Sequence, residues 1–133
     1  MNSFEQNLAD LVPVDKLDTD KASALTALGY PAIEPILPQL LEWLQDINWP
    51  VAQVLQPLLA GIGPPLAPHL RQILRGNDDI WIYWILVSVV AYSPALAGCL
   101  TDELEHLAAN GSAKEGVRNA ARDILNGNYR EPA

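Results

Sequence analysis

Apolar residues recur every four positions in three segments of the chain, and each segment opens with a proline. The segments begin at Pro31, Pro64 and Pro94, so the second starts 33 residues after the first and the third 30 residues later. A spacing of i, i+4 and i+8 places side chains on one face of an α-helix, and proline is favoured in a first helical turn. The pattern predicts three amphipathic helices, with buried positions at Ile33, Leu37 and Leu41, at Leu66, Leu70 and Leu74, and at Leu96, Leu100 and Leu104.

Another helix is expected ahead of each of these segments. Polar residues that favour the N-cap position precede three further stretches, and Gly29 and Gly63 follow two of them as stop signals. The expected helices are Thr19 to Leu28 capped by Asp18, Trp49 to Ile62 capped by Asn48, and Asp79 to Tyr92 capped by Asn77 or Asp78. A last amphipathic helix is expected from Ser112 to Leu125.

These elements predict an all-α fold built from a repeated unit of helix, tight turn and helix. A unit of this kind cannot bury its apolar stripe without the next one, so we expect the units to stack as a HEAT-like α-solenoid. One domain is expected over residues 1–126, closed by the last helix, and residues 127–133 are expected to form a frayed tail. Alternating runs bounded by hairpin turns, which would indicate strands, are absent from the sequence.

Two resemblances accompany this pattern. The turn Leu28-Gly29-Tyr30-Pro31-Ala32-Ile33-Glu34-Pro35 resembles a HEAT-type repeat, whose helices join through a glycine and a following Ala-hydrophobic-Pro segment. Further similarity over residues 11–108 is carried by Leu11-Val12-Pro13, Asp15-Lys16, Ile47-Asn48-Trp49-Pro50-Val51-Ala52 and Asp78-Asp79-Ile80-Trp81-Ile82-Tyr83-Trp84. In these residues the chain is similar to a family of small, mostly bacterial proteins labelled only as a domain of unknown function. The resemblance implies a HEAT-like fold without assigned catalysis, and some relatives look like members of toxin–immunity neighbourhoods.

Composition and charge narrow the classes of function. Half of the 133 residues are hydrophobic and the mean hydropathy is +0.08, which favours a folded core over disorder. A net charge of -8 repels phosphate backbones and anionic lipids, so nucleic acids and membrane surfaces are poor candidate partners. The longest apolar run, residues 80–92, is shorter than the roughly 20 residues of a membrane span. Because Cys99 is the only cysteine and the N-terminus lacks a signal-peptide pattern, we expect a cytoplasmic location.

Catalytic chemistry has few candidate residues. The histidines are His69 and His106, and the repeat alignment places His69 and Cys99 at matching positions of neighbouring helices. A Cys–His dyad requires contact between the two side chains, but the equivalent residue of the first repeat is Ile36, so packing is the favoured interpretation. His106 is expected to face solvent. We therefore expect no catalytic residues, no cofactor and no enzymatic activity.

Metal binding has one candidate region. Glu42 and Asp46 share a helix face, and Asp78 and Asp79 begin the next repeat, so these four acids are expected to form one acidic end. Acids at a helix start are ordinary capping residues, and no glycine-bearing EF-hand loop surrounds them, so no metal site is expected. A second acidic group is expected to form a solvated face in the first turn of its helix: Asp102, Glu103 and Glu105.

Tryptophans lie next to the first acidic group. Trp49 and Trp81 both open first helices of their repeats, so we expect them near one another at one edge. Core packing is one interpretation, and an exposed tryptophan beside carboxylates is typical of a hot spot for a basic partner. The candidate partner-binding residues are Glu42, Asp46, Asn48, Trp49, Asp78, Asp79 and Trp81. A basic stripe on the last helix is expected to be a solvated face: Lys114, Arg118 and Arg122.

The sequence therefore predicts a non-catalytic helical-repeat module that binds another protein, a basic one, through an acidic edge that carries tryptophan. An inhibitor or immunity-type role is one form of this function. Two alternatives stay open at this point. One is a small metal- or ligand-dependent enzyme that uses Asp78, Asp79, Glu42 and His69, and the other is a structural homodimer formed through apolar repeat faces. The sequence leaves the oligomeric state undecided.

Overall fold

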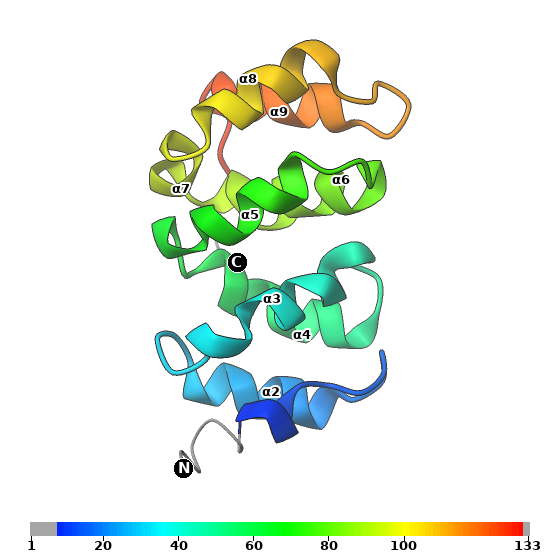
Figure 1. Cartoon of the computed structure of the whole chain (residues 1–133), viewed down its shortest axis with the longest axis vertical. Coiled ribbons are helices and arrows are strands. Elements are labelled where there is room, and N and C mark those ends of the chain that lie inside the picture. The colour runs from blue at the N-terminus through cyan, green and yellow to red at the C-terminus, as the bar shows by residue number, and fades with distance from the viewer. Residues whose placement is uncertain (1–7, 132–133) are drawn as a thin grey trace.

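The computed structural model describes residues 8–131, and within this range the chain is all-helical without β-strands, as predicted. The helices lie in successive layers along the long axis of the molecule, from α2 (Thr19–Leu28) at one end to α9 (Val117–Leu125) at the other (Figure 1). None of the helices in residues 8–131 combines the length and the apolar composition that a membrane crossing requires.

The second and third proline-led segments become helical at Pro64 and Pro94, as predicted, but the first becomes helical at Glu34, so its predicted start at Pro31 is wrong. All three segments are built in two parts. A 3₁₀ turn, η1 (Glu34–Ile36), leads into α3 (Leu37–Glu42), and η3 (Pro64–Leu66) leads into α5 (Ala67–Leu74). In the third segment α7 (Pro94–Gly98) is followed by α8 (Thr101–Asn110). The nine predicted positions, from Ile33 to Leu104, are each at most 2% exposed, so the predicted buried stripe is confirmed.

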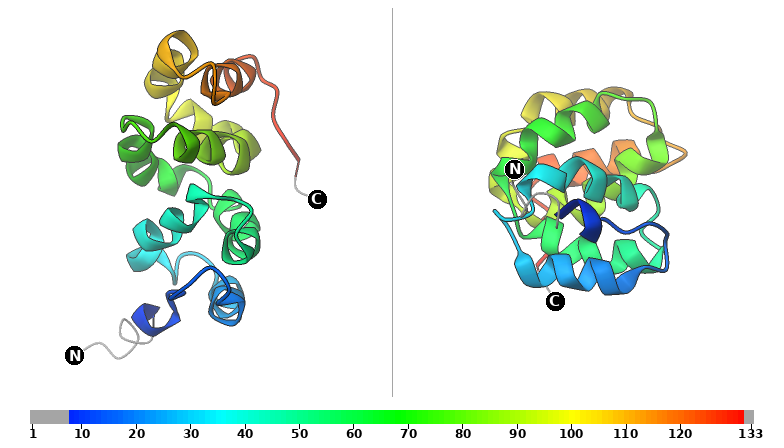
Figure 2. Two further views of the ribbon diagram at one scale, coloured as in Figure 1. Left: turned by 90° about the vertical axis from the view of Figure 1, so that its right-hand side faces the viewer. Right: turned by 60° about the horizontal axis from the view of Figure 1, so that its bottom comes forward.

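The other helices form a second column beside α3, α5 and α8. These are α2, α4 (Pro50–Ala60), α6 (Asp79–Ser88) and α9, and the left view of Figure 2 shows the two columns side by side. Within the second column α2 packs on α4 and α6 packs on α9. Between the columns, η2 (Trp43–Gln45) packs on α6, α5 packs on α6, and α8 packs on α9.

The helix caps agree with the sequence in part. Asp78 caps α6, because its Oδ1 accepts a hydrogen bond from the backbone N–H of Trp81 at 3.1 Å. Asn48 was expected to cap α4, and that expectation is wrong. The N-cap residue is Trp49, and the backbone N–H of Asn48 donates to Asp46 Oδ1 at 2.9 Å instead. Asp46 thus closes a turn ahead of the helix, and the turn shifts the start of α4 by one residue.

The apolar run over residues 80–92 forms a buried helix that is shorter than predicted. α6 ends at Ser88, Val89 leaves helical geometry with φ -127° and ψ -63°, and η4 (Val90–Tyr92) follows. Ile82, Ile85 and Leu86 are in the core. This helix therefore contributes to the core of the molecule.

The last helix also begins later than predicted, at Val117 rather than Ser112. Gly116, with φ +79°, precedes it in the left-handed region that glycine adopts at little cost. A Cβ on Gly116 would lie 3.0 Å from Tyr83 Cε1, so α6 approaches the backbone closely here. Beyond α9 the chain runs back along the second column (Figure 2), where the backbone N–H of Arg130 donates to the carbonyl of Ala91 at 2.7 Å.

Candidate functional site

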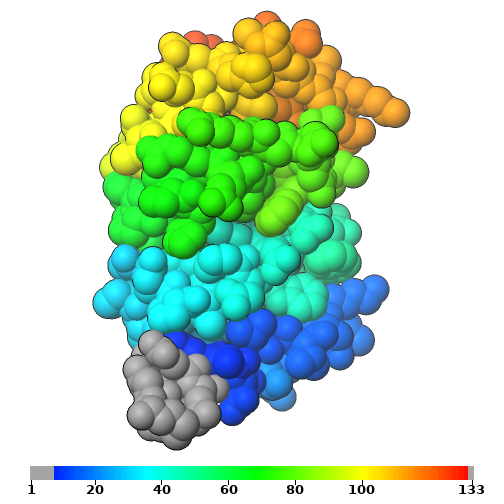
Figure 3. All heavy atoms as spheres, viewed as in Figure 1, coloured from blue at the N-terminus to red at the C-terminus, as the bar shows by residue number. Residues whose placement is uncertain are grey.

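Two of the predicted partner-binding residues, Glu42 and Trp81, line one open pocket. It lies between α3 and α5, has a volume of about 430 Å³, and includes the indole of Trp81 from α6. We call it the Trp81 pocket, and its lining residues are Pro38, Gln39, Leu41, Glu42, His69, Gln72, Ile73 and Trp81. It opens on the face formed by α3, α5 and α8, which Figure 3 views directly.

Trp81 is held by two hydrogen bonds in this position. Its backbone N–H is bound by the Asp78 cap, and its indole Nε1–H donates to the carbonyl of Leu41 at 3.1 Å. The second bond joins residues 40 positions apart and ties α6 to the end of α3. Because the polar edge of the half-buried ring is satisfied, Trp81 offers the pocket a fixed aromatic wall.

Trp49 packs against the core, which is one of the two interpretations that the sequence offered for it. It makes an edge-to-face contact with Trp43, with ring centroids 5.8 Å apart and an interplanar angle of 76°. Both rings are half-buried and pack against the core. Together with the turn formed by Asp46 and Asn48, Trp49 serves to anchor the start of α4. Neither it nor Asp46 and Asn48 lines the Trp81 pocket.

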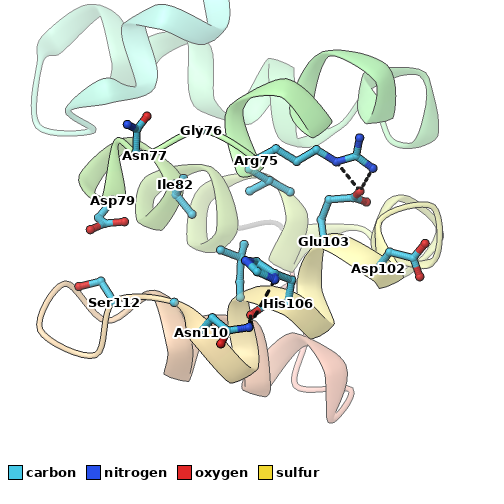
Figure 4. Close-up of a pocket in the computed structure, with 13 residues that line it drawn as sticks. Arg75, Gly76, Asn77, Asp79, Ile82, Asp102, Glu103, His106, Asn110 and Ser112 are labelled. Carbon is cyan, nitrogen blue, oxygen red and sulfur yellow. Dashed lines mark hydrogen bonds and ion pairs between the residues drawn. The ribbon is translucent and has the colours of Figure 1, made fainter.

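Asp79 faces a second pocket on the same side of the molecule. This pocket has a volume of about 580 Å³ and lies between the α5–α6 connection and α8 (Figure 4). Its floor is apolar, with Leu74, Ile82 and Leu107. We call it the Asp79 pocket, and its other lining residues are Arg75, Gly76, Asn77, Asp79, Asp102, Glu103, His106, Asn110, Gly111 and Ser112.

One wall of the Asp79 pocket is an ion pair that the sequence pattern missed. Glu103 was expected to be solvated, and that expectation is wrong, since its side chain is only 5% exposed. Its carboxylate accepts hydrogen bonds from Arg75, with Nε at 3.0 Å from Oε2, and Arg71 Nε lies 3.9 Å from Oε1. Asp102 and Glu105 are exposed, as predicted. The only signal in the sequence was the pair of arginines, Arg71 and Arg75, at i and i+4 in and just after α5.

The histidines and the cysteine do not form a catalytic pair. His69 Nε2 lies 3.5 Å from Glu34 Oε1, whereas the Cys99 thiol donates to the carbonyl of Ala95 at 3.4 Å. Cys99 is exposed, so the packing role expected for it is wrong, while His69 is partly covered. His106 is exposed, as predicted, and its Nδ1 lies 3.4 Å from Asn110 Nδ2. A nucleophile beside an oriented base is therefore not assembled from these residues.

Residues 8–131 contain no group of three or more His, Cys, Asp or Glu side chains that could hold a metal ion. The four acids that were expected to form one acidic end have different places in the fold. Glu42 lines the Trp81 pocket, Asp79 lines the Asp79 pocket, Asp46 closes a turn and Asp78 caps α6. A metal-dependent enzyme built on Glu42, Asp78, Asp79 and His69 thus has no ligand set in the described part of the chain.

The basic stripe is partly tied to the fold. Lys114 is exposed but precedes α9, and Arg122 Nε donates to the carbonyl of Ala108 at 3.1 Å. Arg118 is half-buried, so the expectation of a fully solvated stripe is wrong at that position. The hydrogen bond of Arg122 ties α9 to α8. Arg118 and Arg122 belong to α9, which lies at the end of the molecule opposite α2 (Figure 1).

No curated protein is significantly similar to the chain. The family model of DUF5071, described as a domain of unknown function, matches residues 11–125. This match runs past residue 108, where the resemblance in the sequence ended, and includes α9. Because the match covers most of the 133 residues, the chain belongs to the DUF5071 family of domains of unknown function.

Proposed function

We propose that this protein is a non-catalytic interaction module, a HEAT-like α-solenoid that binds a basic protein. The two columns of helices and the equivalent burial of the three leucine-rich stripes support the solenoid. Solenoids present long surfaces to their partners, because each layer adds a similar strip of side chains. Here α3, α5 and α8 contribute such a strip, and both pockets open along it.

The observation that carries the proposal is the pairing of Trp81 with Glu42 in one open pocket. An aromatic ring beside a carboxylate favours a cationic side chain, which gains cation–π attraction and an ion pair in one place. The net charge of -8 adds a negative field that attracts a basic protein and repels acidic ones. An inhibitor or immunity-type protein that neutralises a basic enzyme is the form of this function that we favour.

Charge reversal on the proposed face tests this function. The purified chain is immobilised, proteins from the source organism that it retains are identified, and each is purified and assayed for direct binding. The test variant is Glu42→Lys with Asp79→Lys, and the control is Asp20→Lys with Asp123→Lys. All four positions are exposed, and both double variants change the net charge from -8 to -4.

The proposal expects the test variant to lose most of the affinity for the partner, while the control retains it except for a small effect of net charge. Equal loss in both variants would mean that the partner responds to net charge alone, and no loss in the test variant would place the interface elsewhere. Sedimentation of the free chain at the same concentrations tests the alternative of a structural homodimer. A homodimer would show twice the 14.5 kDa mass of the single chain.

A further inference from the structure

The two pockets lie on opposite flanks of a single helix, α5. His69, Gln72 and Ile73 line the Trp81 pocket, and Leu74 and Arg75, at the end of the same helix, line the Asp79 pocket. α5 therefore forms a ridge between two openings on one face. A partner segment that crosses this ridge reaches both pockets at once.

The Trp81 pocket has the chemistry of an arginine site. Glu42 supplies a carboxylate, Gln39 and Gln72 supply amide oxygens, and Trp81 supplies an aromatic wall. Guanidinium is planar, has five N–H donors and stacks on aromatic rings, so it can use all of these groups together. The apolar side chain of Ile73 lies beside the methylene stem of such a residue.

The Asp79 pocket also favours a basic side chain. Arg75 brings a positive charge to its wall, but Glu103 pairs with that charge and is itself buried. Asp79 and Asp102 make no ion pair with another residue in the range 8–131, so the pocket keeps a negative surplus. Figure 4 shows Asp79 at the far end of the pocket from Arg75, across the apolar floor.

The width of α5 sets the smallest spacing that a segment reaching both openings has to span. A helix with its side chains is about 10 Å across, so the openings on its two flanks are separated by about that distance. In a polyproline II segment, residues i and i+3 project to the same side and are about 9 Å apart, because the helix has three residues per turn and a rise of about 3.1 Å. Residues i and i+2 of an extended strand also project to one side, but they span only about 6.6 Å.

We propose that the partner is recognised through an extended segment with two basic residues three positions apart, an arginine in the Trp81 pocket and an arginine or lysine in the Asp79 pocket. This inference rests on the proposed function, since it names the chemistry of the partner for the same face. It adds a spacing rule, a dependence of affinity on the number of residues between the two basic side chains, which a general attraction between opposite charges does not predict.

Short peptides test this rule on the full chain. The probe is the acetylated and amidated peptide Arg-Pro-Pro-Arg, and ¹H–¹⁵N spectra of the labelled protein follow its binding at low salt. The comparison peptides replace either arginine with citrulline, which keeps the shape and removes the charge, or shorten the spacer to one proline. The protein variants are Glu42→Gln and Asp79→Asn, with the exposed Asp20→Asn as the matched control.

The proposal expects Arg-Pro-Pro-Arg to shift the indole N–H signal of Trp81 and to bind at least about tenfold more tightly than either citrulline peptide. The short-spacer peptide should lose several-fold in affinity. Glu42→Gln should weaken binding of the parent peptide and of one of the two citrulline peptides, the one that keeps the arginine of the Trp81 pocket. Asp20→Asn should leave the affinity unchanged.

Peptides that bind equally with either spacer, or with citrulline in place of arginine, would overturn the spacing rule. Peptide-induced signal shifts confined to residues outside both pockets would also overturn the spacing rule. The peptide test and the charge-reversal test can give different answers. If the peptides break the spacing rule but Glu42→Lys with Asp79→Lys abolishes binding of a captured protein, the proposed function stands and only the chemistry of the segment is wrong. If the peptides obey the rule and the double variant leaves binding of the captured protein unchanged, the proposed function fails instead.

Discussion

Gly111 is a position where neighbouring atoms leave no room for a side chain. A Cβ there would lie 2.5 Å from the carbonyl oxygen of Leu107 and 2.8 Å from Val117 Cγ1. The first contact is with helix backbone of α8, which cannot turn aside as a flexible side chain does. The residue thus fixes how closely the end of α8 approaches the start of α9.

We expect Gly111→Ala to lower the free energy of unfolding by about 1 to 3 kcal/mol, because the added methyl overpacks this junction. Gly98 is the matched control. It lies at the end of α7 with nothing within 4 Å of a Cβ, so alanine there should be neutral or slightly stabilising. Urea denaturation measures both. A Gly111→Ala variant as stable as Gly98→Ala would show that α8 and α9 have freedom to separate.

Cys99 gives a second prediction at the residue scale. Its thiol is exposed just beyond α7, so a thiol reagent should react with the folded protein at a rate within a few-fold of that for the unfolded chain. His69→Ala should leave this rate unchanged, because His69 lies beside Glu34 rather than beside the thiol. If Cys99 is labelled only at the rate of global unfolding, its thiol is covered in solution.

At the scale of the helix, Leu70 is the central residue of the buried stripes. It lies in α5, the middle helix of its column, and is 0% exposed. Leu70→Ala should destabilise the fold by about 2 to 5 kcal/mol, since it creates a cavity between packed layers that can collapse only in part. Leu28→Ala, at a leucine that is 43% exposed, is the control and should cost about 1 kcal/mol or less. Chemical denaturation measures the free energy of unfolding of both variants. Equal decreases would contradict the assignment of Leu70 to the buried face of α5.

The bridge between Arg75 and Glu103 joins α5 to α8. Arg75→Met keeps much of the aliphatic stem and removes the guanidinium, which leaves the buried Glu103 carboxylate with Arg71 as its remaining cation, at 3.9 Å. We expect a loss of about 1 to 3 kcal/mol, because a buried acceptor is left underpaired. In the double variant Arg75→Met with Glu103→Leu, much of the loss should return, since no buried charge remains. A double variant less stable than the single one would mean that packing, not charge, sets the cost.

The helices could be predicted from the sequence because their signal is local. The nine positions predicted from the i, i+4, i+8 spacing are all buried, and α2 was predicted with its bounds correct. Their ends were harder to predict where two local options compete. Asp46 accepts the N–H of Asn48 and thereby displaces the expected cap, and Val89 ends a helix that its apolar neighbours would continue. Such choices depend on tertiary packing, which overrides propensity.

At the scale of the whole molecule, the site was harder to predict than the helices. The sequence placed Glu42 and Trp81 at one edge, and in the fold both line the Trp81 pocket. The sequence cannot distinguish a tryptophan that lines a pocket from one that packs on another ring, so Trp49 and Trp81 appeared equivalent. Glu103 likewise reads as a solvated acid until the folded chain brings Arg75 to it. Pockets formed across layers depend on contacts between residues far apart in sequence.

The last prediction concerns the charge of the whole molecule and the kinetics of association. A net charge of -8 should attract a basic partner, and Glu42 and Asp79 add negative charge at the two pockets, so the association rate constant should fall as salt is raised. Glu42→Gln with Asp79→Asn should lower this rate constant several-fold at low salt and flatten its salt dependence. Asp78 is left intact in this variant because it caps α6.

Trp81→Phe should act on the other rate constant. Phenylalanine keeps an aromatic ring but loses the indole N–H bond to Leu41 and part of the cation–π attraction, so dissociation should speed up with little change in association. Surface plasmon resonance with the identified partner separates the two rate constants. Lys114→Glu with Arg122→Glu, on and just before α9, should slightly increase the association rate constant by making the chain more acidic. If this reversal instead abolished binding and the Glu42 and Asp79 variant bound normally, the partner would dock at the end of the stack that carries α9.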